Sequence, residues 1–180
     1  MDAITCIESR RSVRKYADKP IEQETLKKIV EATAFAPSWK NTQIVRYTIV
    51  TDRAKISAIA NEAVLDFAFN TKTMERSTLL AVQTVVTGIS GCEKDGSFST
   101  ARGDSWEMYD AGISAQTFCL AAHNYGVGTV IMGVVDGPKI KEMLDLPENE
   151  AVTTVIAMGY PLTQNPAPPR KTVAELLRFK

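Results

Sequence analysis

Four cations and a serine lie close together near the start of the chain, in the run Arg10-Arg11-Ser12-Val13-Arg14-Lys15. The planar guanidinium of arginine binds phosphate through two parallel hydrogen bonds, and a serine hydroxyl can add another. In an extended segment alternate side chains share a face, so we expect Ser12 and Arg14 to point with Arg10. This pattern predicts a site for a phosphate at one end and a polar ring edge at the other. A solvated run of charge is the alternative that the residue types leave open.

A second basic segment ends the chain, where residues 170–180 hold four cations and one acid, Glu175. The whole chain is balanced, with 21 basic and 21 acidic residues. This balance argues against a nucleic-acid-binding protein, which usually carries a basic excess on one face. The two basic segments could converge on one small anion, or they could be solvated ends that never meet.

Other catalytic chemistries find little support. The three cysteines (Cys6, Cys92 and Cys119) and the single histidine, His123, are widely spaced and predict no metal site. Without a G-x-S-x-G motif, nothing supports a Ser-His-Asp hydrolase. There is neither a dinucleotide-binding G-x-G-x-x-G in the right context nor a P-loop, so arginines would have to hold an anionic cofactor. We assign no catalytic side chain.

The expected location is the cytoplasm. Few, scattered cysteines fit a reducing compartment. Charged residues such as Asp2 and Glu8 interrupt any apolar N-terminal stretch, so no signal peptide is predicted. No segment approaches the roughly 20 apolar residues of a membrane span, so we expect no membrane partner.

The elements that must position these residues alternate between helices and strands. Apolar periodicity predicts helices over residues 2–9, 22–35, 53–63, 64–76, 108–124 and 136–146. Alternating or continuous apolar runs predict strands over residues 45–49, 79–89, 130–135 and 152–158, with 79–89 in the centre of the sheet. Residues 90–105 predict a long loop. No repeat or linker divides the chain, so we expect one domain over residues 1–180.

Two features predict contact with a second copy of the chain. The helix over 108–124 is rich in alanine, glycine and serine, which allow close packing at the centre of the fold or of a dimer. Four prolines between residues 161 and 170 predict a stiff arm, and Thr172 with Glu175 has the spacing of a capping box before a short helix. We expect the arm, about residues 161–180, to pack on a partner subunit; simple surface cover is the alternative.

Several motifs, in order along the chain, resemble those of the nitroreductase family. The basic run is similar to that family's R-R-S-[VI]-R opening, and residues 36–43 (APSWKNTQ) resemble its A-P-S-x-x-N-x-Q loop. Asp110, Gly112 and Gln116 match a central D-x-G-x-x-x-Q helix. Residues 126–129 (GVGT), 159–161 (GYP) and 170–171 (RK) resemble its closing elements. The matches cover nearly the whole chain.

The resemblance implies a fold and an activity. The fold is an α+β three-layer sandwich, with a central, mostly antiparallel sheet flanked by helices. Two subunits intertwine as a homodimer with FMN at the interface. NADH or NADPH is the expected electron donor, and an electron-poor small molecule such as a nitroaromatic or quinone is the expected acceptor, in a ping-pong reaction.

The resemblance also implies which residues contact FMN. Arg10, Arg11 and Ser12 would face the phosphate and ribityl chain, and Arg14 would approach the pyrimidine edge of the ring. Arg170 and Lys171 would complete the phosphate site. The other subunit would contribute four residues of the 36–43 loop: Pro37, Ser38, Trp39 and Asn41.

Further contacts come from the middle of the chain. Met132 and Gly133 would offer backbone groups near flavin N5. Asn70, after Phe69, matches a flavin-contacting asparagine of larger members, whose lysine three residues later is replaced here by Thr73; adjacent Lys72 is the candidate substitute. Larger members also have inserted helices that restrict the substrate pocket, and residues 90–105 are the candidate replacement.

Three alternatives stay open at this point. The same fold could support another flavin reaction, such as enoate reduction, dehalogenation or flavin breakdown. The chain could be a non-enzymatic flavin-binding redox module. It could also be an α/β interaction domain whose arginines are surface charges.

Overall fold

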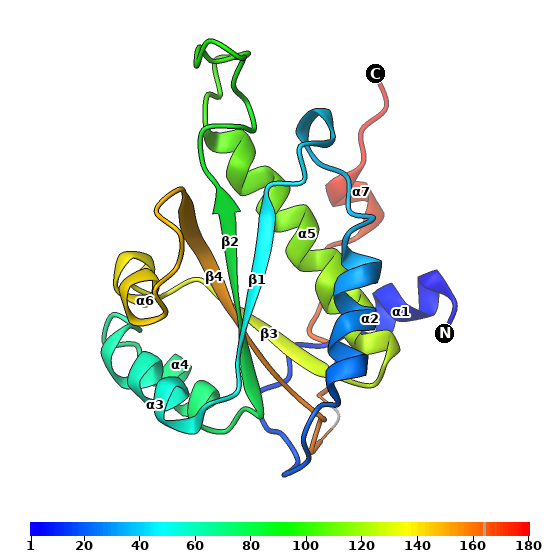
Figure 1. Ribbon diagram of the computed structural model, residues 1–180. Coiled ribbons are helices and arrows are strands. Elements are labelled where there is room, and N and C mark those ends of the chain that lie inside the picture. The colour runs from blue at the N-terminus through cyan, green and yellow to red at the C-terminus, as the bar shows by residue number, and fades with distance from the viewer. Residues whose placement is uncertain (164) are drawn as a thin grey trace.

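A computed structural model describes residues 1–163 and 165–180. Its sheet has four strands in the order β1-β2-β4-β3, and every neighbouring pair is antiparallel (Figure 1). The strands are β1 (Val45–Val50), β2 (Leu79–Val86), β3 (Gly128–Met132) and β4 (Glu150–Gly159). All four overlap the apolar runs that predicted strands in the sequence.

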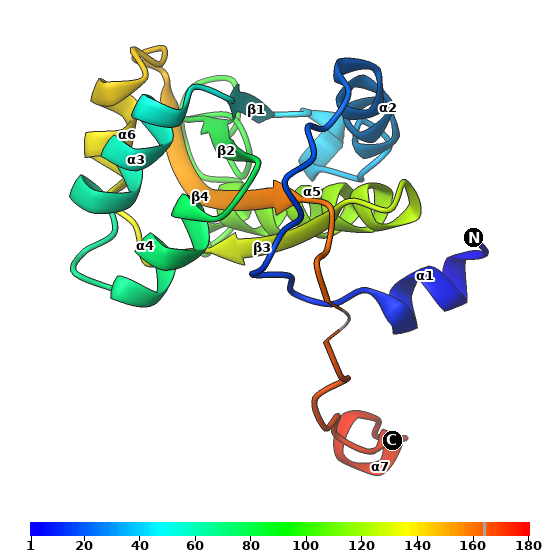
Figure 2. The ribbon, with the colours of Figure 1, turned by 90° about the horizontal axis from the view of Figure 1, so that it is seen from below.

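Helices cover both faces of the sheet (Figure 2). One face is covered by α2 (Gln23–Thr33) and the long α5 (Ser105–Asn124), with α1 (Ala3–Ser9) packed on α5. The other face is covered by α3 (Arg53–Glu62), α4 (Ala68–Glu75) and α6 (Gly137–Met143). The predicted α+β sandwich with an antiparallel sheet is therefore confirmed.

The position of β2 between two layers of helices explains why its sequence is apolar almost throughout. Leu79 and Ala81 pack with α2 and α5, whereas Leu80 and Val82 pack with α3, α4 and α6. Because successive side chains of a strand point to opposite faces, a strand covered on both sides is mostly apolar. Its two buried polar side chains, Gln83 and Thr84, are both hydrogen-bonded. This two-sided core holds the site-bearing segments against the sheet.

Some element boundaries differ from those predicted. Leu65 and Asp66 adopt positive φ angles of 47° and 58°, which a helix cannot accommodate, so α4 begins only at Ala68. Strand β3 begins at Gly128 and ends at Met132, earlier than the predicted 130–135, because its pairing with β4 starts at Gly128 opposite Gly159. The predicted loop 90–105 lies between β2 and α5.

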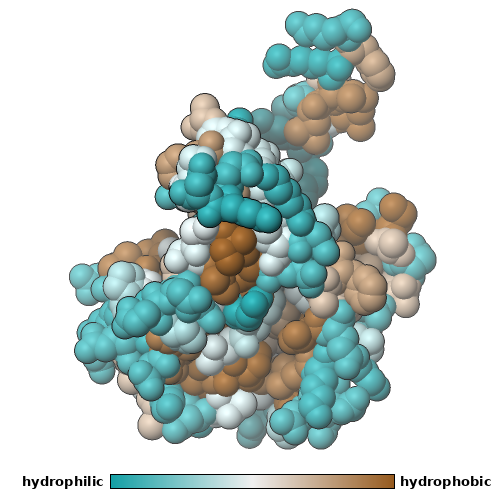
Figure 3. All heavy atoms as spheres, turned by 45° about the horizontal axis from the view of Figure 1, so that its top comes forward, coloured by the Kyte–Doolittle hydropathy of each residue, from teal (hydrophilic) through white to brown (hydrophobic). Residues whose placement is uncertain are grey.

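The C-terminal arm leaves the body and ends in the short helix α7 (Val173–Leu176), which begins with the predicted capping box (Figure 2). Apolar side chains gather on this projecting segment (Figure 3). The exposed ones include Val173, Leu176, Leu177 and Phe179. In the part of the chain that the structure describes, no helix is long and apolar enough to cross a membrane.

Candidate functional site

The basic run is an extended segment held between two strand ends. The Val13 amide donates to the carbonyl of Thr129 in β3 at 2.9 Å. Beyond β4, the Leu162 amide donates to the carbonyl of Lys15 at 3.0 Å. Val13 and Tyr16 are buried below the segment. The backbone is therefore fixed by the sheet, and the cationic side chains are directed away from the core.

Two glycines allow this close approach. A methyl group added at Gly128 would lie 2.7 Å from Cγ2 of Val13. A methyl group added at Gly159 would lie 2.7 Å from Cδ1 of Tyr16. Gly128 and Gly159 belong to two of the motifs on which the resemblance rested, and their structural role is to let the basic segment pack directly on the sheet.

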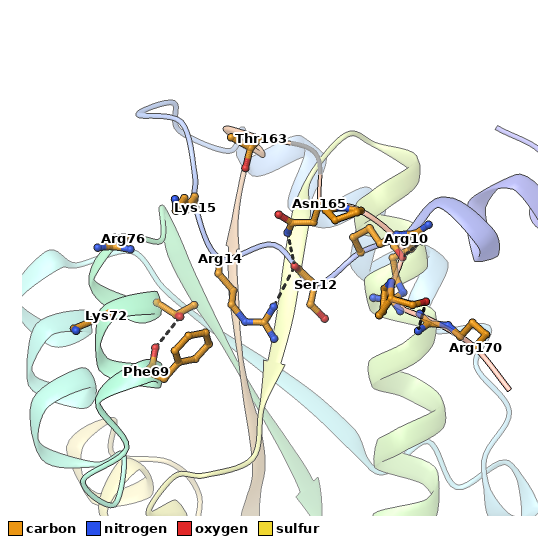
Figure 4. A pocket seen from close by; sticks show the side chains of 14 residues that line it. Arg10, Ser12, Arg14, Lys15, Phe69, Lys72, Arg76, Thr163, Asn165 and Arg170 are labelled. Atoms are coloured by element: carbon orange, nitrogen blue, oxygen red, sulfur yellow. Dashed lines mark hydrogen bonds between the residues drawn. The ribbon is translucent and has the colours of Figure 1, made fainter.

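A cavity of about 560 Å³ opens above the basic segment (Figure 4). This size lies in the range of roughly 300–1,000 Å³ typical of small-molecule sites. Seven cations and no carboxylate are found among its described lining residues. The lining consists of Arg10, Arg11, Ser12, Arg14, Lys15, Phe69, Lys72, Thr73, Arg76, Thr163, Asn165, Pro166, Pro168 and Arg170.

The two basic ends of the sequence converge at this cavity. Asn165 donates from Nδ2 to the carbonyl of Ser12 at 2.9 Å, which holds the start of the arm over the basic segment. Arg170 follows on the arm and lines the same cavity as Arg10. Nε of Arg10 is buried and has no hydrogen-bond partner among the described residues. A buried, unpaired guanidinium nitrogen fits a site that a ligand with an anionic oxygen completes.

Arg11 and Arg14 behave differently from Arg10. Arg11 turns back toward the end of α1, where its Nη1 donates to the carbonyl of Glu8 at 2.6 Å and of Arg10 at 2.8 Å. Arg14 is exposed and lies over the ring of Phe69, with 5.5 Å between the guanidinium carbon and the ring centroid. Arg11 thus stabilises a helix end. Arg14 makes a long hydrogen bond, 3.4 Å from its Nη1 to the carbonyl of Ser12, and lines the cavity as an exposed side chain.

Helix α4 supplies the opposite wall of the cavity. Lys72 and Thr73 line the cavity, and the Thr73 hydroxyl donates to the carbonyl of Phe69 at 2.8 Å. Asn70 is buried and donates from Nδ2 to the carbonyl of Val134 at 3.1 Å. Asn70 therefore connects α4 to the chain after β3 and is not among the described lining residues.

Three other predicted residues also lie outside the cavity lining. Met132 is buried at the end of β3, and its carbonyl accepts from the Thr154 hydroxyl at 2.8 Å. Gly133 follows it and is exposed. Lys171 is exposed on the arm, one residue beyond Arg170.

The 36–43 loop lies at a different place, beside a groove of about 200 Å³ that Pro37 and Ser38 help to line. The loop is held by Asp110 of α5, whose two carboxylate oxygens accept from the Trp39 amide at 3.0 and 3.1 Å. The Ser90 hydroxyl donates to the same carboxylate at 2.6 Å. Asn41 follows in the exposed part of the loop, with a positive φ of 56°.

The ring of Trp39 is also fixed. Its centroid lies 4.7 Å from that of Trp106 at the start of α5. Its indole Nε1 is buried with no hydrogen-bond partner among the described residues. The loop is thus well anchored, yet none of its residues lines the basic cavity of the same chain.

Sequence reasoning missed several residues of the site. Asp110 was noted only as part of a motif, although its carboxylate positions the loop. Lys15, Arg76 and Asn165 line the cavity but were not predicted to do so. Lys15 could have been found as the continuation of the basic run, whereas Asn165 carries no signal because the path of the arm is set by tertiary contacts.

A histidine lies behind the basic segment. Burial lowers the pKa of His123, and the nearby positive charges of Arg10 and Arg11 lower it further. Its Nε2 is 2.8 Å from the Ser9 hydroxyl at the end of α1. His123 therefore joins α1 to α5 and responds to the charge of the cavity without lining it.

Comparison with known proteins connects this geometry to a family. Residues 7–160 match the model described as "Nitroreductase family". An FMN reductase (NAD(P)H) of Bacillus subtilis is 31% identical, over 94% of this chain and 70% of its own length. An NADPH-flavin oxidoreductase of Vibrio harveyi is 32% identical, over 92% of this chain and 68% of its own. The crystal structure of a protein from Streptococcus pneumoniae, 17% identical, superposes with a TM-score of 0.87 and covers 99% of this chain and 100% of its own, which supports the fold.

Proposed function

Because this chain belongs to the nitroreductase family, we propose that it is an FMN-dependent NAD(P)H oxidoreductase that reduces an electron-poor small molecule. The observation that carries this proposal is the convergence of Arg10 and Arg170 on one cavity, where Nε of Arg10 is buried and finds no hydrogen-bond partner in the described part of the chain. The similar Bacillus subtilis and Vibrio harveyi proteins, named for FMN or flavin and for NAD(P)H or NADPH, support the cofactor and the donor.

The residues of the cavity fit FMN in a defined direction. Arg10, Ser12 and Arg170 would hold the phosphate, which carries a charge of about −1.5 to −2 at neutral pH. Arg14, on the α4 side of them, would face the polar edge of the ring and stabilise negative charge there. When bound, FMN supplies the redox chemistry, taking up a hydride from the nucleotide and passing electrons to the acceptor. We assign no side chain as an obligatory acid or base.

We further propose that the site is completed in a homodimer, with Pro37, Ser38, Trp39 and Asn41 reaching the cavity of the partner. The loop is anchored, but none of its residues lines the basic cavity of its own chain. Phe35, directly before the loop, is 88% exposed. The exposed face of α5, which includes Met108, Tyr109 and Gly112, and the apolar arm would be covered in the same dimer.

The test begins with the absorption spectrum of the purified protein. We expect a yellow protein whose flavin band is bleached by NADH or NADPH without oxygen and returns when a quinone or nitroaromatic is added. A protein purified and reconstituted with FMN that stays colourless would contradict FMN binding. A yellow protein that neither nucleotide bleaches would be a flavin-binding module.

Substitution then tests the phosphate site. Arg10→Ala and Arg170→Ala should each weaken FMN binding by roughly 1.5–3 kcal/mol, the range for a hydrogen bond to a charged group. Lys28→Ala, an exposed cation on α2, is the matched control and should leave the affinity unchanged. Equal FMN affinity of Arg10→Ala and wild type, measured by fluorescence titration, would reduce the basic segment to solvated surface charge.

A further inference from the structure

The basic cavity has two cationic ends separated by the Arg14–Phe69 pair (Figure 4). Arg10 and Arg170 lie at one end, beside Ser12 and Asn165. Lys15, Lys72 and Arg76 lie on the side of α4. In the proposed function the phosphate of FMN lies at the first end, which leaves the cations of the second end without an assigned anion.

Helix α4 presents these residues on one face. Phe69, Lys72, Thr73 and Arg76, the C-cap residue, recur at positions i, i+3, i+4 and i+7. Residues with this spacing are neighbours on the helix surface. The face that lines the cavity therefore begins with an aromatic ring and ends with two cations, and Lys15 of the basic segment lies across from it.

The cations of this end are not neutralised within the described chain. Each of the salt bridges formed by the described residues uses other cations, namely Lys40, Arg53, Lys139 and Lys141. The nearest acid in the sequence, Glu75, is already engaged by the side chains of Arg53, Ser57 and Asn61. Like charges four residues apart on a helix cost stability, so the pair Lys72 and Arg76 is unfavourable without an anion.

We propose that Lys72 and Arg76, with Lys15, bind an anionic group of the molecule that stacks on the flavin ring. This inference rests on the proposed function, because it assumes that FMN occupies the cavity with its phosphate at Arg10. The group is a phosphate or a carboxylate, held at the far side of the Arg14–Phe69 pair from the FMN phosphate. It could come from the donor, as the 2′-phosphate of NADPH, or from an acidic acceptor. The three cations thus select charged substrates over neutral ones of the same shape.

The experiment measures binding to the oxidised, FMN-loaded protein, so that it does not depend on turnover. Two probe pairs differ by one anionic group: adenosine 2′,5′-bisphosphate against adenosine 5′-monophosphate, and 4-nitrobenzoate against 4-nitrobenzamide. Calorimetry gives the dissociation constant of each nucleotide, and the shift of the flavin absorbance gives that of each nitroaromatic. We expect wild type to prefer the charged member of one pair by roughly tenfold, about 1.4 kcal/mol.

The double variant Lys72→Gln/Arg76→Gln should lose this preference and keep its affinity for the neutral probe. Lys28→Gln/Lys55→Gln removes the same charge from exposed positions on α2 and α3 and should keep the preference. Loss in the nucleotide pair identifies the donor as the source of the anion, and loss in the nitroaromatic pair identifies the acceptor.

Two results would overturn the proposal. One is an unchanged preference, or none in the wild type, for both probe pairs. The other is a double variant whose FMN affinity falls as far as its affinity for the charged probe, because the cations would then serve the flavin. A protein that binds FMN and shows the expected preference, but is reduced by neither NADH nor NADPH, would count against the proposed function alone.

Discussion

The basic cavity and the 36–43 loop are held in different ways. The cavity is built by segments of one chain, since β3 hydrogen bonds to the basic run at Val13 and the arm does so through Leu162 and Asn165. The loop is held by the Asp110 carboxylate and by the contact of Trp39 with Trp106. An ion pair of Lys40 with Glu93 and a hydrogen bond between Thr42 and Ser90 add to this anchoring. The cavity is lined within its own subunit, whereas the anchored loop contributes nothing to that lining. This difference is what the proposed homodimer predicts, because there the loop of one subunit would complete the cavity of the other.

Complementation between two defective chains tests most strongly whether the cavity and the loop of one site come from different subunits. Arg10→Ala should damage the cavity half, and Asp110→Ala should damage the loop half. If each site combines the cavity of one subunit with the loop of the other, a mixed dimer contains one fully intact site and one doubly defective site. After co-refolding of equal amounts, about a quarter of all sites should bind FMN as wild type does.

The control for this experiment is Trp39→Ala in place of Asp110→Ala, because it changes the loop and leaves the buried carboxylate in α5. Either loop variant should restore sites when mixed with Arg10→Ala, and neither should restore them when the two loop variants are mixed. No recovery in any mixture would show that both halves of a site belong to the same chain.

A smaller effect tests how tightly the cavity half is built. Gly128→Ala places a methyl group 2.7 Å from Cγ2 of Val13. The backbone at Val13 can move away only by losing the hydrogen bond from its amide to the carbonyl of Thr129. Overpacking of this kind costs about 1–3 kcal/mol. We expect a lower melting temperature of the FMN-free protein and weaker FMN binding.

The matched control is Gly133→Ala, just beyond the same strand, where an added methyl group meets nothing within 4 Å. Its stability without FMN should stay within about 0.5 kcal/mol of wild type. If the two alanine variants melt at the same temperature, the close packing of the basic segment on the sheet is not what stabilises the cavity.

The sequence predicted the structural features that depend on local patterns. Alternating or continuous apolar runs identified the strands, and the capping-box spacing of Thr172 and Glu175 identified α7. It could not predict that Arg11 turns back to the carbonyl of Glu8, because this depends on where α1 ends. Nor could it place Asn165 beside Ser12, since 153 positions separate the two residues along the chain.

The resemblance to a family names more candidate site residues than the residue patterns do, but it does not say how each residue acts. The motifs containing Gly128 and Gly159 served only to carry the resemblance, whereas the structure shows that both glycines make room for buried side chains. Asp110 likewise belongs to a motif, and its carboxylate acts by fixing the Trp39 amide. Motifs of this chain thus include residues that position the site as well as residues that line it.

The smallest expected effect is a pH dependence that belongs to the cavity half alone. His123 has a lowered pKa in the folded protein, first through burial and then through Arg10 and Arg11. Above its ordinary pKa of 6.5 both folded and unfolded chains hold a neutral imidazole. As the pH falls below that value the unfolded chain takes up its proton first, so the free energy of unfolding must decrease until the folded histidine is also protonated. His123→Gln can keep a hydrogen bond to Ser9 without titrating, and it should lose this part of the decrease between pH 7.5 and 5.5 in urea unfolding of the FMN-free protein.

Bound phosphate beside Arg10 would offset the positive charge, so FMN should raise the pKa of His123 and weaken the effect. The same decrease in His123→Gln as in wild type would assign the pH dependence to other groups, and a histidine pKa that FMN leaves unchanged would mean that the phosphate does not lie near Arg10.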